Sequence, residues 1–147
     1  MRRILTVATL VAIGLSLGPS LAAARGRPAK LELRRTNVGT ILVDGQGFTL
    51  YAFTRDSRNH DACAQMSGCL GAWPALTSSA KPVAGGGVRA GLIGTITLRG
   101  GAKQVTYAGH PLYTYVGDSG PGSTFYVNIF QFGGRWPAMN AGGTEIK

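Results

Sequence analysis

The chain has 147 residues, a formal net charge of +9 and 23 glycines, with only two cysteines and two histidines. This length suits a single domain with a modest hydrophobic core. The sequence contains neither a basic helix nor a ladder of exposed aromatic residues, which argues against nucleic-acid binding despite the positive charge.

Residues 1–24 have the pattern of a signal peptide. Arg2 and Arg3 precede an apolar run over residues 4–17, and a stretch of small residues ends at Ala24. The run is shorter than the roughly 20 apolar residues that a membrane-spanning helix requires. We therefore expect cleavage near Ala24 and release into the periplasm or the medium, with no transmembrane anchor on the mature chain.

Residues 25–37 follow as a basic segment, which we predict to be a flexible N-terminal arm. Its positive charge favours attraction to anionic envelope polymers or to another envelope protein. The basic residues of this segment are Arg25, Arg27, Lys30, Arg34 and Arg35.

Residues 38–147 are predicted to form one small, mainly β domain of two pseudo-symmetric repeats of antiparallel hairpins. The first repeat covers about residues 38–80 and the second about residues 88–140, with a connector rich in glycine and proline between them. Apolar residues alternate with polar ones instead of recurring at helical spacing, and glycines fall where hairpins need tight turns. The expected strands are 38–43, 48–53, 92–98, 103–107, 112–115 and 125–132, with a helical turn over 61–68.

The two repeats are visible as recurring blocks of sequence. Residues 47–56, GFTLYAFTRD, recur as residues 109–118, GHPLYTYVGD. A second block, GAWPAL at residues 71–76, returns as GRWPAM at residues 134–139. Self-similarity of this kind predicts a duplicated structural unit.

Eight residues of these blocks are the candidate binding positions. Residues two apart on a strand point to the same face, so Tyr51 and Phe53 present paired rings while Leu50 faces the opposite way. The equivalent residues of the second repeat follow the same pattern. Aromatic rings beside a carboxylate suit a sugar or a cationic ligand, and the same rings also suit a buried core. The eight positions are Tyr51, Phe53, Asp56, Trp73, Tyr113, Tyr115, Asp118 and Trp136.

The two cysteines, Cys63 and Cys69, are expected to form a disulfide. An isolated, even pair in an oxidising compartment is bridged by default. When the repeats are aligned, these positions fall on Phe125 and Phe132 of the second repeat. We interpret the two aromatic residues as closing the same structural layer by apolar burial.

At this point the motifs resemble a known family. The doubled Leu-Tyr-x-aromatic-x-x-Asp pattern, with Trp73-Pro74 and Gly133-Gly134-Arg-Trp136, is similar to bacterial secreted repeat proteins, or predicted lipoproteins, with a conserved Yx(FWY)xxD motif. The similarity covers about residues 38–139. It implies an exported two-repeat protein and no particular activity. The chain lacks the lipid-acceptor cysteine that many relatives carry, so we expect export without a lipid anchor.

The search for catalytic chemistry finds no Gly-x-Ser-x-Gly and no His-Glu-x-x-His motif. We therefore expect a non-catalytic cell-envelope protein without a cofactor, which acts by binding or as a structural component. The alternative is a periplasmic metal-binding or redox-associated protein. That alternative depends on a cluster of soft ligands, which suit copper(I) or zinc, at His60, Cys63, Met66 and Cys69.

Overall fold

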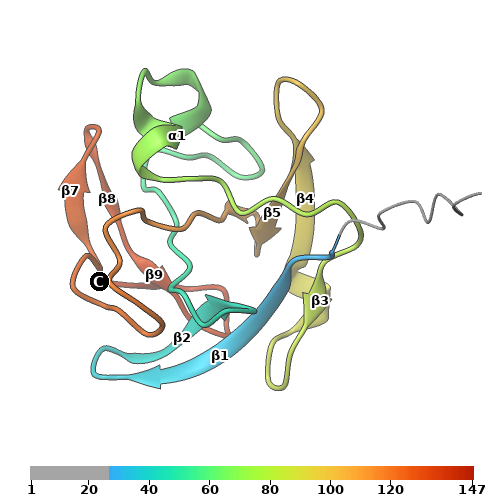
Figure 1. Ribbon diagram of the computed structural model, residues 1–147, viewed down its shortest axis with the longest axis vertical. Helices are drawn as coiled ribbons and strands as arrows, with labels where there is room; N and C mark the ends of the chain where they lie inside the picture. The colour runs from blue at the N-terminus through green and yellow to red at the C-terminus, as the bar shows by residue number, and fades with distance from the viewer. Residues whose placement is uncertain (1–26) are drawn as a thin grey trace, which may run out of the picture.

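The computed structural model describes residues 27–147 (Figure 1), so the predicted signal peptide at residues 1–24 lies outside the described part. The described chain is mainly β, as predicted. Its strands are β1 (Lys30–Thr36), β2 (Gly39–Asp44), β3 (Val83–Ala84), β4 (Ile93–Thr97), β5 (Lys103–Tyr107), β6 (His110–Pro111), β7 (Ile129–Gln131), β8 (Gly134–Trp136), β9 (Ala138–Met139) and β10 (Glu145–Ile146). The short helical elements are η1 (Cys63–Gln65), α1 (Cys69–Ala72) and η2 (Ala90–Leu92).

The strands are arranged in small sheets, with the orders β2-β1-β3, β4-β5-β6, β7-β8 and β10-β9. Paired strands are antiparallel, apart from the parallel pair β1 and β3. Figure 1 shows the β1–β2, β4–β5 and β7–β8 hairpins around the outside, with extended segments crossing the space between them. These crossing segments carry Tyr51, Phe53, Tyr113 and Tyr115, whereas Trp136 lies in β8.

The prediction of a flexible arm over residues 25–37 is wrong for the described part, because Lys30–Thr36 forms β1 and pairs with β2. Leu31 is fully buried in the core, and Leu33 packs against the same cluster. Side chains two apart on a strand share one face, so the two leucines anchor this segment to the domain. The arginines beside them remain on the surface.

The hairpin expected in the second repeat is present. β5 and β6 pair around a turn at Ala108 and Gly109, whose φ angles of 51° and 86° are positive. In the first repeat, the expected strand 48–53 follows β2 only briefly, where the Leu50 N–H donates to Leu42 O at 3.0 Å. It then crosses to residues of the second repeat, which provide the hydrogen bonds that a local hairpin would have supplied.

The core consists of three clusters, of which two lie on opposite faces of the crossing segments and the third contains Ile41, Val43 and Ala138. Leu50 and Leu112 belong to an aliphatic cluster, whereas Tyr51 and Phe53 belong to an aromatic one. This arrangement confirms the predicted alternation, because successive residues of an extended chain point to opposite faces. The buried members of the aromatic cluster are at most 1% exposed and comprise Tyr51, Phe53, Cys63, Cys69, Trp73, Tyr113 and Trp136.

The expectation that Phe125 is buried is wrong, because its side chain is 87% exposed. The neighbouring residue, Tyr126, packs on the aromatic cluster instead, with its ring centroid 4.6 Å from that of Tyr115. Residues 125–128 form a turn, and only Ile129–Gln131 of the predicted strand 125–132 forms a strand, β7. Phe132, the second aligned aromatic residue, does pack against the aromatic cluster.

Candidate functional site

The two copies of the motif meet at the centre of the domain. The Tyr51 N–H donates to Tyr113 O at 2.9 Å, and the Tyr113 N–H donates to Tyr51 O at 2.9 Å. Equivalent residues of the two repeats therefore exchange a reciprocal pair of hydrogen bonds, as antiparallel strands do. This pair relates the repeats as a pseudo-twofold axis would.

Each motif segment also pairs with the Trp-Pro block of the other repeat. The Ala52 N–H of the first repeat donates to Pro137 O of the second at 2.9 Å. In the symmetric contact, the Thr114 N–H of the second repeat donates to Pro74 O of the first at 3.0 Å. The repeats are therefore interlocked, with backbone pairing that neither repeat provides for itself.

The motif tyrosines and aspartates are exchanged between the repeats. The Tyr113 hydroxyl donates to Asp56 Oδ2 at 2.8 Å, and the Tyr51 hydroxyl lies 3.1 Å from both carboxylate oxygens of Asp118. Asp56 Oδ1 also accepts the Ala62 N–H at 2.8 Å, which ties this aspartate to the loop that follows it. The contact to the tyrosine of the other repeat was not predicted.

The motif aromatics form a continuous stack that alternates between repeats. Phe53 stacks on Trp136 with centroids 4.1 Å apart, Trp136 on Trp73 at 4.0 Å, and Trp73 on Tyr115 at 4.1 Å. Tyr51 meets the edge of this stack, with its centroid 5.1 Å from that of Trp73. Aromatic pairs of this kind each contribute about 0.5–1.5 kcal/mol beyond the area that they bury.

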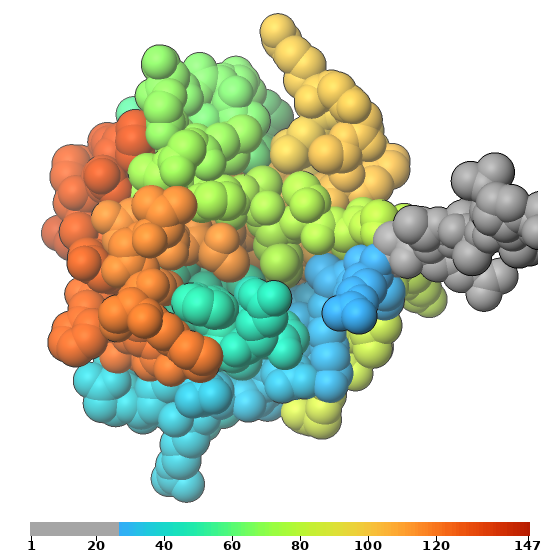
Figure 2. All heavy atoms as spheres, viewed as in Figure 1, coloured from blue at the N-terminus to red at the C-terminus, as the bar shows by residue number. Residues whose placement is uncertain are grey.

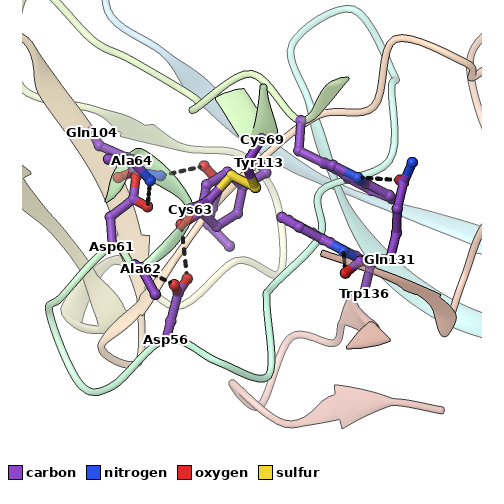
Figure 3. Close-up of a disulfide and its surroundings, with 12 residues drawn as sticks. Asp56, Asp61, Ala62, Cys63, Ala64, Cys69, Gln104, Tyr113, Gln131 and Trp136 are labelled. Atoms are coloured by element: carbon purple, nitrogen blue, oxygen red, sulfur yellow. Dashed lines mark hydrogen bonds between the residues drawn. A yellow bond between two sulfur atoms is a disulfide. The ribbon is translucent and has the colours of Figure 1, made fainter. Parts of the chain in front are cut away.

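One residue outside the repeated blocks satisfies both indole groups. Trp73 Nε1 donates to Gln131 Oε1 at 2.7 Å, and Trp136 Nε1 donates to Gln131 O at 3.1 Å. Gln131, at the end of β7, lies beside Trp136 (Figure 3). Sequence reasoning missed this residue, because no counterpart in the first repeat marks it.

Burial controls the protonation of the exchanged pairs. Desolvation raises the pKa of Asp56 to about 7, with a smaller increase from the nearby charge of Asp61. Desolvation also raises the pKa of Asp118. The pKa values of Tyr51 and Tyr113 rise above their usual range, through burial first and the adjacent carboxylates second. Both hydroxyls therefore remain protonated and act as hydrogen-bond donors.

The predicted disulfide is present. Cys63 and Cys69 are bonded, with their Cα atoms 5.4 Å apart, and the loop they close rests on the aromatic cluster (Figure 3). The alternative metal set is therefore not formed, because both sulfurs are used in the disulfide and His60 hydrogen-bonds with Gln65 at 3.1 Å. Over residues 27–147, no group of three or more His, Cys, Asp or Glu side chains is placed to hold a metal.

The surface of the described chain is strongly cationic. Asp61 is buried, and Asp56 and Asp118 are partly buried, so few fully exposed carboxylates remain to neutralise the basic side chains. Within residues 27–147, the only Lys or Arg with a carboxylate within ion-pair distance is Lys30, beside Glu32. The basic side chains of this surface are Arg27, Lys30, Arg34, Arg35, Arg55, Arg58, Lys81, Arg89, Arg99, Lys103, Arg135 and Lys147.

The interlocked halves correspond to two matches to one protein family, Lipoprotein_15, which is described as a secreted repeat of unknown function. The matches cover residues 33–77 and residues 94–140. No curated protein and no solved structure matches the chain. Among residues 27–147, no helix is both long and apolar enough to cross a membrane. The chain, matched over more than half of its length, belongs to this family of secreted repeats.

Proposed function

We propose that this protein is a secreted, non-catalytic module of the cell envelope that binds an anionic polymer through its cationic surface. The observation that carries the proposal is the imbalance of surface charge. Of the basic side chains on the described residues, only Lys30 has a carboxylate partner. Exposed cations without such partners raise the local concentration of polyanions and steer their association.

The motif residues support this proposal because their polar groups are already hydrogen-bonded inside the domain. The hydroxyls of Tyr51 and Tyr113, both aspartates and both indole N–H groups have hydrogen-bond partners inside the domain. Their rings are stacked on one another, and the tryptophans are fully buried. A sugar or a cationic ligand would have to displace this packing to reach them. We therefore assign ligand binding to the outer surface. The role that we assign to the motif residues is to hold the two repeats together.

Two features support the proposed location: the sequence of residues 1–24 and the disulfide. The sequence of residues 1–24 fits an export signal, and the Cys63–Cys69 bridge is stable in an oxidising compartment. The bridge and the interlocked repeats make a rigid support for the charged surface. Many weak contacts along a polymer then add up, because each later contact forms at high effective concentration.

The test is equilibrium binding of the mature, oxidised protein to polyphosphate, with neutral dextran as the control polymer. We expect binding to polyphosphate at low salt, and we expect the affinity to fall steeply as salt rises from about 0.01 M to about 0.15 M. Absence of binding to polyphosphate at low salt, or equal binding to dextran, would contradict the proposal.

A further inference from the structure

One groove on this surface collects two of its cations. It has a volume of about 470 Å³ and lies between residues 78–82 and strand β4. Its lining includes Lys81 and Lys103, the hydroxyl residues Ser79 and Thr95, and an apolar wall at Ile93. We call it the lysine groove. Figure 2 shows the gold β4–β5 hairpin projecting from the body of the molecule beside the yellow-green segment that precedes it in the chain.

The backbone on both sides of Lys81 is held in place. The Ser78 hydroxyl is buried, accepts the Ala29 N–H at 2.8 Å and donates to Ala80 O at 2.6 Å. Two residues after Lys81, the Val83 N–H donates to Ala29 O at 2.8 Å. Lys81 therefore projects from a fixed segment, which reduces the entropy lost when a ligand binds its ammonium group.

The other wall is equally well defined. Lys103 begins β5 and pairs with Thr97 at the end of β4, and its Nζ donates to Thr97 Oγ1 at 2.5 Å. An ammonium group has three donors, so two remain for a ligand. None of the described residues that line the groove is acidic. The groove therefore offers two lysines and the Thr95 hydroxyl in a concave setting, while the Ser79 hydroxyl already donates to Arg27 O at 3.2 Å.

Two surface arginines lie outside the lysine groove and hydrogen-bond to backbone carbonyls. The Arg58 guanidinium donates to Ala108 O at 3.2 Å, and that of Arg135 donates to Asn128 O at 3.1 Å. Both are thus engaged with the backbone of exposed turns. A lysine ammonium is a compact point charge that suits phosphate oxygens without requiring the flat, forked geometry of a guanidinium partner.

We propose that the lysine groove binds phosphate groups of the anionic polymer, with Lys81 and Lys103 as the cations that contact them. This inference rests on the proposed function and adds a location and a ligand chemistry to it. Polymer segments outside the groove are attracted by the remaining surface charge without a fixed contact. The groove is consequently the place where the affinity is concentrated.

The test compares two double variants of equal charge change in polyphosphate binding at low salt. We expect Lys81→Gln with Lys103→Gln to weaken binding by at least about tenfold, because two charge-assisted contacts are lost. The matched control, Arg58→Gln with Arg135→Gln, loses two hydrogen bonds to backbone carbonyls and some long-range attraction but no contact in the groove, and it should weaken binding by no more than about twofold. Circular dichroism establishes that both variants are folded.

A second measurement uses the unaltered protein and does not depend on the folding of a variant. Lysine acetylation is followed residue by residue with and without polyphosphate. We expect the polymer to protect Lys81 and Lys103, and to leave the rate at Lys147 nearly unchanged. Equal losses of affinity in the two double variants, or equal protection of all three lysines, would contradict the assignment of phosphate binding to the lysine groove. The proposed function would be unaffected by either result. Absence of polyphosphate binding by the wild-type protein would overturn both.

Discussion

The hydroxyl of Tyr113 donates a 2.8 Å hydrogen bond to Asp56, although the two residues belong to different repeats. With the symmetric contact from Tyr51 to Asp118, it ties the end of each motif to the start of the other. A motif whose tyrosine and aspartate lie only five residues apart in sequence thus forms contacts between repeats. Its residues hold the two halves of the domain together.

Removing the Tyr113 hydroxyl tests this contact. Tyr113→Phe leaves a largely buried Asp56 oxygen without its donor, so we expect the free energy of unfolding to fall by about 1–3 kcal/mol. Tyr126→Phe is the control, because the Tyr126 hydroxyl takes no part in the exchange. Urea denaturation measures both. Equal stability of Tyr113→Phe and wild type would contradict the claim that this hydrogen bond holds the two repeats together.

Stability should fall as pH rises from about 4 to about 7. The folded-state pKa of Asp56 is raised from 3.8 to about 7, mainly by burial, so the folded state binds its proton more tightly than the unfolded state. Its stabilising contribution is complete below the ordinary pKa and is lost as pH rises through the raised one. Asp118 shifts in the same direction.

The measurement is the urea midpoint at about pH 5 and about pH 8. We expect a higher midpoint at the lower pH, and a smaller difference in Asp56→Asn, which cannot ionise. A midpoint that rises with pH in the wild type would show that the hydrogen bonds to the charged carboxylate outweigh its desolvation.

Two glycines at equivalent positions of the repeats should respond differently to alanine. A Cβ on Gly134 would lie 2.6 Å from Phe53 Cε2 and 2.9 Å from Arg55 Cγ, whereas a Cβ on Gly71 meets nothing within 4 Å. Gly134→Ala should therefore cost about 1–3 kcal/mol through displacement of the aromatic stack. Gly71→Ala, in α1, should be neutral or slightly stabilising. Thermal unfolding of the two variants distinguishes these outcomes, and similar losses in both would contradict the packing described.

The disulfide should brace the first repeat. Replacing both Cys63 and Cys69 by Ser removes the cross-link over a short loop, and we expect a loss of about 2 kcal/mol in stability. Intact-mass measurement after alkylation checks the bridge itself. Two thiols should react only after reduction; reaction of both in the native, unreduced protein would show that the bridge is not formed.

Much of the fold was predictable, because alternation along a strand is a local property. The opposite faces of Leu50 and Tyr51, the hairpin at Gly109 and the disulfide all follow from residues that are close in sequence. β1 was missed because the neighbouring charges of Arg34 and Arg35 masked the alternation of its leucines. The basic composition of that segment therefore predicted a flexible arm, although its leucines alternate as in a strand.

The candidate site was harder to predict, since its contacts join residues of different repeats. The eight candidate residues are brought together, with five of them buried in the core and Asp56, Tyr115 and Asp118 partly buried beside them. A repeat seen alone gives no sign that Tyr113 bonds to Asp56. Nor does it show that Gln131 satisfies both tryptophans. The lysine groove was also invisible, because Lys81 and Lys103 are brought together only by the tertiary fold.

The central claim is that the motif holds the repeats together while the cationic surface binds the ligand. The most direct test is the polyphosphate affinity of folded Tyr113→Phe, a change that alters no charge. We predict an affinity within about twofold of wild type, because the surface cations remain in place. A loss of tenfold or more in a variant that keeps the native circular dichroism spectrum would place the binding site at the motif and contradict this account.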